Sequence, residues 1–292
     1  MWFYGPRGRP PRGLSLRVTE ARVEYLGLYL DPKWRFKEHF ARLAPRVRKV
    51  AKSLTRLLPN LGGPREKVRC LFVNVVHAVS LYGSPLWAEV AAGAGARSKF
   101  GLLRVAQRVV AFRVIRGFHT VATETAGVLV GIPPLALFAQ MYSARYSRRV
   151  ELLQEVVERD GLREALANAK RQAWRQLLQD WEQRLEEPRA AVQTIVQVVR
   201  PYLQMWLEQG AGRLTYRMTQ VLTGHGCFGE YLCRIKKEPT AQCHECRAVS
   251  DSVRHTVEHC PQWANKRREL VAKIGADLSL CLKRALARDK DK

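Results

Sequence analysis

Apolar positions near the start of the chain follow the two-residue period of extended strands. Leu14, Leu16 and Val18 alternate with polar residues, and a second extended run covers Val23 to Leu30. The pattern predicts two strands. An isolated pair of strands is only marginally stable in water, and no further convincing strand run follows in the sequence. We therefore expect the pair to be the edge of a larger sheet that this chain lacks.

From Phe40 onward the apolar residues recur at the spacing of amphipathic helices. The first predicted helix buries one face, made of Phe40, Leu43, Val47, Val50, Leu54 and Leu57. After a break at residues 60–64, the next is predicted to bury Val68, Leu71, Phe72, Val75, Val76 and Val79. An Ala- and Gly-rich loop over residues 91–96 precedes a helix predicted to bury Leu102, Val105, Val109 and Phe112.

The second half of the chain begins with a long helical region. Gly131-Ile132-Pro133-Pro134 predicts a stop and restart, because proline cannot continue a helix across it. Residues 135–209 then form helix almost throughout, interrupted at Asp160-Gly161, Glu187-Pro188 and Pro201. Their exposed positions carry charges of both signs, which is typical of a helical linker.

The charge of the chain indicates a polyanionic partner. The 50 Lys and Arg outnumber the 26 Asp and Glu, giving a formal charge of +24 and a sequence pI near 10.3. The excess lies mostly in residues 1–150. Phosphate neutralisation is the usual reason to tolerate such self-repulsion, so RNA or DNA is the first candidate. The alternative is that excess arginine only solubilises helices.

Cysteine usage and the N-terminal residues bear on the compartment. The seven Cys are an odd number and cluster toward the C-terminus, unlike the even spread of a secreted disulfide scaffold. The Gly-, Pro- and Arg-rich stretch 5–12 cannot be a signal peptide, and no apolar run is long enough to span a bilayer. We expect an intracellular protein of the nucleus, nucleolus or cytoplasm, with no membrane and no small-molecule substrate.

The strongest local signal is Cys243-x2-Cys246-x8-His255-x4-Cys260. The tight spacing of the first pair lets two thiolates face one metal ion, and three thiolates with one imidazole close a tetrahedron without an open position. Ligand softness and availability favour zinc, in a structural role. His259 is the alternative fourth ligand, although its position next to Cys260 would strain the chelate. The competing interpretation is a polar loop without metal.

Basic residues surround these predicted elements. On the helices we expect contacts with the nucleic-acid backbone from Arg42, Arg46, Lys49, Arg56, Arg104 and Arg108. Near the metal ligands, phosphates are the expected partners of Arg234, Lys236, Lys237, Arg247, Lys266, Arg267 and Arg268. A solvated face is the alternative for this second group. We expect no second metal site at His225, Cys227 and Cys233, because they lack a tight pair.

Several segments, in this order, resemble one family. They are Tyr25-Leu26-Gly27-Leu28-Tyr29-Leu30-Asp31, Leu58-Pro59-Asn60-Leu61-Gly62-Gly63-Pro64, Leu81-Tyr82-Gly83-Ser84-Pro85-Leu86-Trp87, Gly131-Ile132-Pro133-Pro134-Leu135, and Leu222-Thr223-Gly224-His225-Gly226 before the Cys3His set. Together they resemble the C-terminal part of the reverse-transcriptase polyprotein of insect non-LTR retrotransposons, the type I elements that insert into ribosomal RNA genes.

The resemblance implies a mainly α fold with four parts. Residues 1–36 would be a palm remnant whose Tyr25, Leu26 and Gly27 form a primer-grip-like hairpin turn. Residues 37–134 would be a thumb-like helical bundle, 135–210 the helical linker, and 211–292 a zinc-knuckle region that binds nucleic acid. The partners implied are element RNA, target DNA and the template-primer duplex.

The resemblance also implies an activity that this chain alone should not have. The whole family protein is an RNA-directed DNA polymerase with an endonuclease, and its polymerase needs paired carboxylates that hold two Mg²⁺ ions. No Asp-Asp pair occurs here, and Asp31 is the only Asp in the first 150 residues. Three hypotheses stay open: a terminal piece of such a polyprotein, a free-standing adaptor or chaperone derived from one, and a truncated relic.

Overall fold

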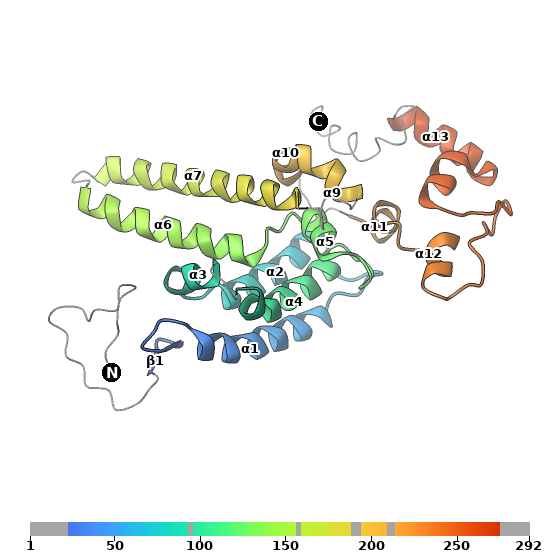
Figure 1. Cartoon of the computed structure of the whole chain (residues 1–292). Helices are drawn as coiled ribbons and strands as arrows, with labels where there is room; N and C mark the ends of the chain where they lie inside the picture. Colours follow the sequence, from blue (N-terminus) through green and yellow to red (C-terminus); the bar gives the residue numbers. More distant parts are fainter. Residues whose placement is uncertain (1–22, 93–95, 156–158, 188–193, 209–213, 275–292) are drawn as a thin grey trace. The chain divides into compact units, whose positions relative to one another are not determined.

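The computed structural model describes residues 23–92, 96–155, 159–187, 194–208 and 214–274. These residues form a mainly α-helical fold with a short β-hairpin, as predicted (Figure 1). The first elements are β1 Val23–Tyr25, β2 Leu28–Leu30, α1 Lys37–Thr55, α2 Glu66–Ser80, α3 Ser84–Ala92, α4 Ala96–Val114 and α5 Thr123–Val130. They are followed by α6 Leu135–Glu155, α7 Arg159–Leu185, α9 Thr194–Val199, η1 Arg200–Tyr202, α10 Leu203–Glu208, α11 Tyr216–Thr223, α12 Gly229–Arg234, η2 His255–His259, η3 Pro261–Trp263 and α13 Ala264–Ile274.

The chain divides into two compact units that alternate along the sequence. The first comprises the described residues of 1–57, 68–110 and 133–181, and the second those of 58–67, 111–132 and 182–292. Helices α4 and α7 each contribute residues to both units. The four-part division at residues 36, 134 and 210 stays a prediction.

The hairpin occupies the run that the alternation predicted to be one strand. Val23 pairs with Leu30 and Tyr25 with Leu28 in antiparallel register. Leu26 (φ 48°) and Gly27 (φ 77°) make the turn between them. Two residues at positive φ suit the twist of a tight hairpin, so the run from Val23 to Leu30 folds back on itself as two short strands. The strand predicted at Leu14 to Val18 lies outside the described residues.

The Asp31 carboxylate organises the approach to α1. It accepts backbone N–H bonds from Lys33 (3.1 Å), Arg35 (3.1 Å) and Phe36 (2.7 Å). Phe36 precedes the helix at a φ of 53° and is fully buried. The side chain of Asp31 therefore satisfies backbone donors that the helix itself cannot pair.

Helix α1 buries much of the face that its periodicity predicted. Phe40, Leu43 and Val47 are in the core. Pro45 lies in the interior of the helix, beyond its first turn. Leu57 is wrong as a core residue: it is 59% exposed, because the helix ends at Thr55 and no longer directs the side chain inward.

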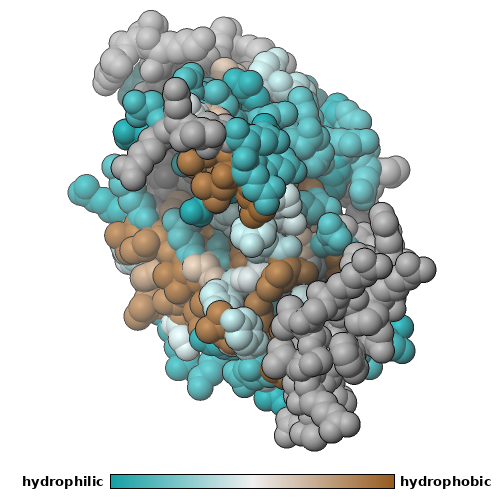
Figure 2. All heavy atoms as spheres, turned by 90° about the vertical axis from the view of Figure 1, so that its left-hand side faces the viewer, coloured by the Kyte–Doolittle hydropathy of each residue, from teal (hydrophilic) through white to brown (hydrophobic). Residues whose placement is uncertain are grey.

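Helix α2 buries a different face from the one predicted. Val68, Leu71 and Val75 were expected in the core but are 42%, 56% and 39% exposed. Its buried positions include Val73 and Val76, and two polar residues, Arg69 and Ser80. Ser80 can be buried because its hydroxyl donates to the carbonyl of Val76 (2.7 Å). Figure 2 shows apolar residues at the surface among hydrophilic ones on the face that it presents.

The buried face of helix α4 was also predicted wrongly, and a side-chain contact explains why. Val105 and Val109 are exposed, whereas Leu103, Ala106, Gln107 and Val110 are buried. The Gln107 amide donates to the carbonyl of Pro133 (2.8 Å) and accepts from the Leu135 N–H (3.3 Å). One buried amide thus satisfies the backbone of the turn before α6, and its position fixes which face of α4 is inside.

Helix α3 was not predicted, yet it supplies the centre of the first unit. Trp87 is completely buried, its ring meets that of Phe40 edge to face at 5.3 Å, and its indole N–H donates to the Tyr82 carbonyl (3.0 Å). Helix α3 packs against α6, where the Ser143 hydroxyl approaches the carbonyl of Pro85 at 3.5 Å.

The later boundaries follow the prediction in part. Helix α5 ends at Gly131, whose φ of 76° suits glycine, and α6 begins at Leu135 after the two prolines. Helix α6 ends at Glu155 and α7 begins at Arg159, so Asp160-Gly161, predicted to interrupt the helical region, lie in the first turn of α7. In the described part of the chain no single helix is long and apolar enough to cross a membrane, although two bent helix pairs reach that length and composition.

Candidate metal centre and nucleic-acid interface

The four predicted metal ligands converge in the second unit. The Sγ atoms of Cys243, Cys246 and Cys260 and a ring nitrogen of His255 all lie within 4.8 Å of one another. Cys246 Sγ and His255 Nε2 lie 3.2 Å apart. Cys243 and Cys260 are buried, while the other two are half-buried. Three thiolates and one imidazole at these separations match a closed tetrahedral zinc set.

A tight turn holds the first two ligands. The Cys243 N–H donates to the Ala248 carbonyl (2.9 Å), and the Arg247 N–H donates to the Cys243 carbonyl (3.0 Å). Arg247 adopts a φ of 64°, which lets the backbone reverse directly after Cys246. A hydrogen bond from the backbone of Ala248 lowers the pKa of the Cys246 thiol. The turn therefore both presents this sulfur and favours its thiolate form, which metal binding requires.

The structure places His255, and not His259, in the cluster. The N–H of His255 donates to the Ser252 hydroxyl (3.0 Å), which fixes the start of the short helix η2. The Cys260 N–H then donates to the carbonyl of His255 (2.7 Å), so these two ligands are locked one turn apart. His259 is exposed and its Nε2 lies 3.7 Å from the Glu258 carboxylate. Burial raises the pKa of the Cys260 thiol, a cost that a bound cation would offset.

Asp251 supports the metal loop and was missed by the sequence analysis. Its buried carboxylate accepts from the Gly229 N–H (3.0 Å) and the Thr256 hydroxyl (2.7 Å). Its own N–H donates to the Ala241 carbonyl (2.7 Å). A Cβ at Gly229 would lie 2.6 Å from that same carbonyl oxygen, so only glycine fits. No sequence signal distinguishes this buried acid from a surface one.

Replacing Asp251 with alanine is expected to lower the free energy of unfolding by about 3 kcal/mol, because the buried Gly229 N–H and the part-buried Thr256 hydroxyl lose their acceptor. Urea unfolding of the purified chain measures this. Glu245→Ala, which removes an exposed acid from the same loop, is the matched control and should change the value by less than about 0.5 kcal/mol. Equal effects of the two variants would contradict the role assigned to Asp251.

His225, Cys227 and Cys233 do not join the metal cluster. The His225 ring stacks on Tyr231 at 4.7 Å, and the Thr120 hydroxyl lies 3.1 Å from His225 Nδ1. Burial, with help from the Arg234 charge, lowers the pKa of His225 to about 4. This residue therefore packs as a neutral ring. Among the described residues the structure gathers no other group of three or more ligands around it.

The basic residues predicted on α1 and α4 differ in their availability. Arg42 pairs with Glu38 (Nε to Oε1, 2.8 Å) and lies 4.4 Å above the centre of the Tyr29 ring. Hydrogen bonding to Glu38 accordingly raises its pKa. The other members on α1 and just beyond its end, Arg46, Lys49 and Arg56, are exposed, as is Arg104 on α4, whereas Arg108 is half-buried.

The basic residues near the metal ligands also differ in whether their side chains already have partners within the protein. Arg267 donates to the carbonyls of Val257 (2.8 Å) and Cys260 (2.6 Å), so its guanidinium binds the metal loop itself. Lys266 pairs with Glu269 (3.2 Å), and Arg268 donates to Asn265. Arg234 lies 5.3 Å from the centre of the Tyr231 ring. The exposed members also include Lys236, Lys237 and Arg247.

The predicted primer-grip-like residues form the hairpin tip. Tyr25 and Leu26 are 61% and 71% exposed. The Leu26 carbonyl accepts a hydrogen bond from the Tyr82 hydroxyl (2.8 Å), and Gly27 completes the turn. The tip is thus tied to the start of α3 within the first unit.

Comparison with known proteins gives two retrotransposon relatives. The chain is 26% identical over 249 residues to a putative 115 kDa protein in the type-1 retrotransposable element R1DM of Drosophila melanogaster, covering 83% of this chain and 24% of that protein. It is 24% identical over 271 residues to a retrovirus-related Pol polyprotein from the type-1 retrotransposable element R1 of Bradysia coprophila, covering 89% of this chain and 26% of that protein.

Other comparisons give no match. No protein-family model matches the chain, and no solved structure does. The chain spans about a quarter of the length of the curated relatives it matches. Over most of its own length it is therefore similar to the C-terminal part of R1-type retrotransposon polyproteins.

Proposed function

We propose that this chain is the nucleic-acid-binding C-terminal portion of an R1-type retrotransposon polyprotein and that it holds one structural Zn²⁺ ion. The observation that carries the proposal is the convergence of Cys243, Cys246, His255 and Cys260 within 4.8 Å, in a chain similar to R1 polyproteins over more than four-fifths of its length. The whole polyprotein would be an RNA-directed DNA polymerase with an endonuclease, and its Mg²⁺ ions would be held outside this chain.

Two surfaces would contact RNA or DNA. The first is the exposed face of α1, where Arg46 and Lys49 lie opposite the buried Phe40, Leu43 and Val47. The second is the exposed set around the metal loop, including Lys236, Lys237 and Arg247. Cations on rigid elements neutralise phosphates without reading bases, so they would position the strand and leave sequence preference to other contacts. Nuclear localisation follows as part of this proposal, because the substrates of an inserting element are there.

The salt dependence of binding tests this function. Fluorescence anisotropy with labelled RNA and DNA should give a logarithm of affinity that falls linearly with the logarithm of salt concentration, with one counterion released per neutralised phosphate. The double variant Arg46→Ala/Lys49→Ala should reduce that slope by about 2.

The matched control removes two exposed arginines from α7. Arg175→Ala/Arg184→Ala lowers the net charge equally and should leave the slope unchanged. Binding that does not depend on salt, or equal effects of the two double variants, would refute the assignment of α1 to the phosphate backbone.

A second candidate function is a free-standing adaptor derived from such an element. The complete ligand set and its supporting Asp251 and Ser252 contacts favour it. Translation of the genomic nucleotides upstream of Met1 distinguishes the two: an in-frame palm with paired aspartates supports the polyprotein, and its absence supports the adaptor.

A further inference from the structure

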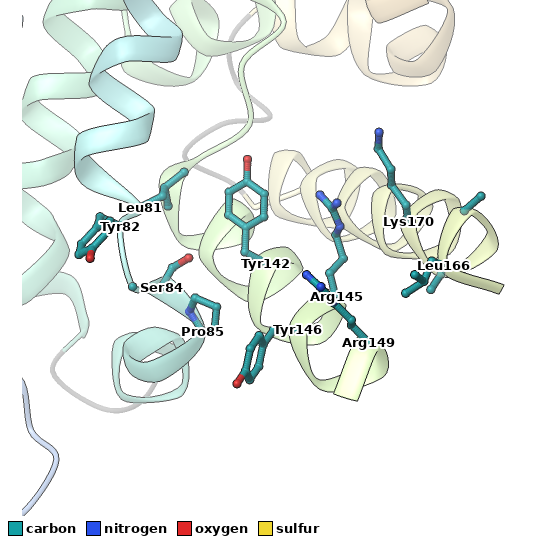
Figure 3. A pocket seen from close by; sticks show the side chains of 13 residues that line it. Leu81, Tyr82, Ser84, Pro85, Tyr142, Arg145, Tyr146, Arg149, Leu166 and Lys170 are labelled. Atoms are coloured by element: carbon teal, nitrogen blue, oxygen red, sulfur yellow. The ribbon is translucent and has the colours of Figure 1, made fainter. Parts of the chain in front are cut away.

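The lining of an open groove in the first unit includes none of the basic residues predicted from the sequence to contact nucleic acid. The groove has a volume of about 700 Å³ and lies between the start of α3 and helices α6 and α7 (Figure 3). Its walls carry the rings of Tyr82, Tyr142 and Tyr146 and the cations of Arg145, Arg149 and Lys170. None of its lining residues is acidic.

The three rings are presented to solvent, two of them from helix α6 and Tyr82 from the turn between α2 and α3. Tyr82, Tyr142 and Tyr146 are 53%, 36% and 56% exposed. The Tyr82 hydroxyl is anchored by its bond to the Leu26 carbonyl, which holds that ring beside the hairpin tip. Helix α6 is held in turn by its packing on α3. The rings are therefore both exposed and held in place. A ring that only packs in the core would not need to be exposed.

The sequence of α6 alternates ring and cation at helical spacing. Tyr142, Arg145, Tyr146 and Arg149 stand at positions i, i+3, i+4 and i+7. The Arg145 guanidinium lies 5.8 Å from the centre of the Tyr142 ring. Figure 3 shows the two tyrosines on the side of Pro85, with Arg145 and Arg149 toward α7. One turn of this helix therefore offers one flat apolar face and one positive charge.

The cations of the groove pair with none of the acidic residues that the structure describes. Within the described ranges, neither Arg145, Arg149 nor Lys170 forms an ion pair, whereas the neighbouring Arg148 pairs with Glu151 (2.9 Å) and Glu155 (3.5 Å) outside the groove lining. A ligand with negative charge and flat apolar groups would satisfy both features. A nucleotide strand has both in every repeat, and stacking on tyrosine is tolerant of base identity.

The spacing selects a single strand over a duplex. Tyr142 and Tyr146 are one helical turn apart, which is about 6 Å along α6. Neighbouring bases in a duplex strand rise by about 3.4 Å and are already stacked on each other, so they cannot offer their faces to two separate rings. A strand that is stretched and unstacked can place one base on each ring.

We propose that this groove is a binding site for single-stranded nucleic acid, in which Tyr142 and Tyr146 stack bases and Arg145, Arg149 and Lys170 hold phosphates. The proposal rests on the nucleic-acid binding proposed above and assigns part of it to a separate site. Tyr82 would extend the stacking platform toward the hairpin tip.

The test compares ring removal with ring retention in the full chain. Tyr142→Leu/Tyr146→Leu keeps apolar volume on α6 but removes the π faces, and Tyr142→Phe/Tyr146→Phe keeps them. Binding of fluorescent oligo-dT and oligo-U should weaken by roughly 5- to 100-fold in the leucine variant. It should stay within about twofold of the parent in the phenylalanine variant, and duplex DNA should bind all three proteins equally. Thermal unfolding of each protein confirms that the fold is kept.

The outcomes separate the groove from the general function. Unchanged binding of the single strands by the leucine variant, with salt-dependent binding retained, would overturn the groove and leave the proposed function standing. A purified chain that binds no oligonucleotide at low salt would overturn both. Displacement of the bound strand from the parent by poly-glutamate as readily as by unlabelled oligo-dT would also overturn the groove, since its rings would then contribute nothing.

Discussion

Replacing Cys243 with serine is expected to abolish the proposed zinc binding and to unfold the loop around Asp251. The buried Cys243 sulfur is one of four ligand atoms within 4.8 Å, and a three-ligand remnant would leave an open position on the ion. Structural zinc sites contribute roughly 10–16 kcal/mol of binding free energy that is coupled to folding. Metal analysis of purified protein should fall from one zinc per chain to near zero.

Backbone hydrogen exchange gives the second measurement. Amides of Cys243, Asp251 and Cys260, which donate to Ala248, Ala241 and His255, should lose protection in the variant and also on chelation of the parent protein. Cys227→Ser, at an exposed cysteine outside the cluster, is the control and should keep its zinc. A full zinc equivalent in the Cys243 variant would disprove the ligand assignment.

Replacing Trp87 with alanine is expected to lower the free energy of unfolding by about 4 kcal/mol. The side chain is fully buried against Phe40, and its removal also deprives the Tyr82 carbonyl of the indole N–H. Equilibrium unfolding in urea measures the change through the shift in midpoint at constant slope.

The control for Trp87 is another tryptophan of the first unit. Trp174 on α7 is 38% exposed, so Trp174→Ala should cost less than about 1 kcal/mol. Trp87→Phe should fall between the two, because the ring is kept and the hydrogen bond is lost. If the Trp87 and Trp174 alanine variants had the same midpoint, α3 would not be central to the core.

Local chemistry explains what could be predicted from the sequence. The ligand spacing of Cys243 and Cys246 and the Gly131 stop depend on residues that are neighbours in the chain, so their patterns are readable there. The prediction of buried helix faces was wrong where a contact with a residue distant in sequence determines which face is buried. Gln107 is buried because it pairs with the turn at Pro133 and Leu135, and this reverses the roles that hydropathy gave to Val105 and Val109.

The same distinction applies to the candidate site. The four metal ligands were found by spacing, but Asp251 and Gly229 support them through contacts between segments more than twenty residues apart. The tyrosines of the groove were also missed. Tyr82 comes from the turn between α2 and α3, far in sequence from Tyr142 and Tyr146 on α6. The i, i+3, i+4, i+7 pattern of Tyr142 to Arg149 becomes informative only once the exposure of its members is known.

The contacts of Arg267 have a consequence for interpreting titrations with polyanions. Its guanidinium is occupied by two carbonyls of the metal loop, and Arg42 and Lys266 face carboxylates. Counterion release registers only those side chains that exchange a solvent ion for a phosphate. The number of neutralised phosphates obtained from the salt dependence of binding will therefore be smaller than the number of arginines and lysines in the sequence. Mutation of Arg267 is expected to destabilise the metal loop more than it changes this number.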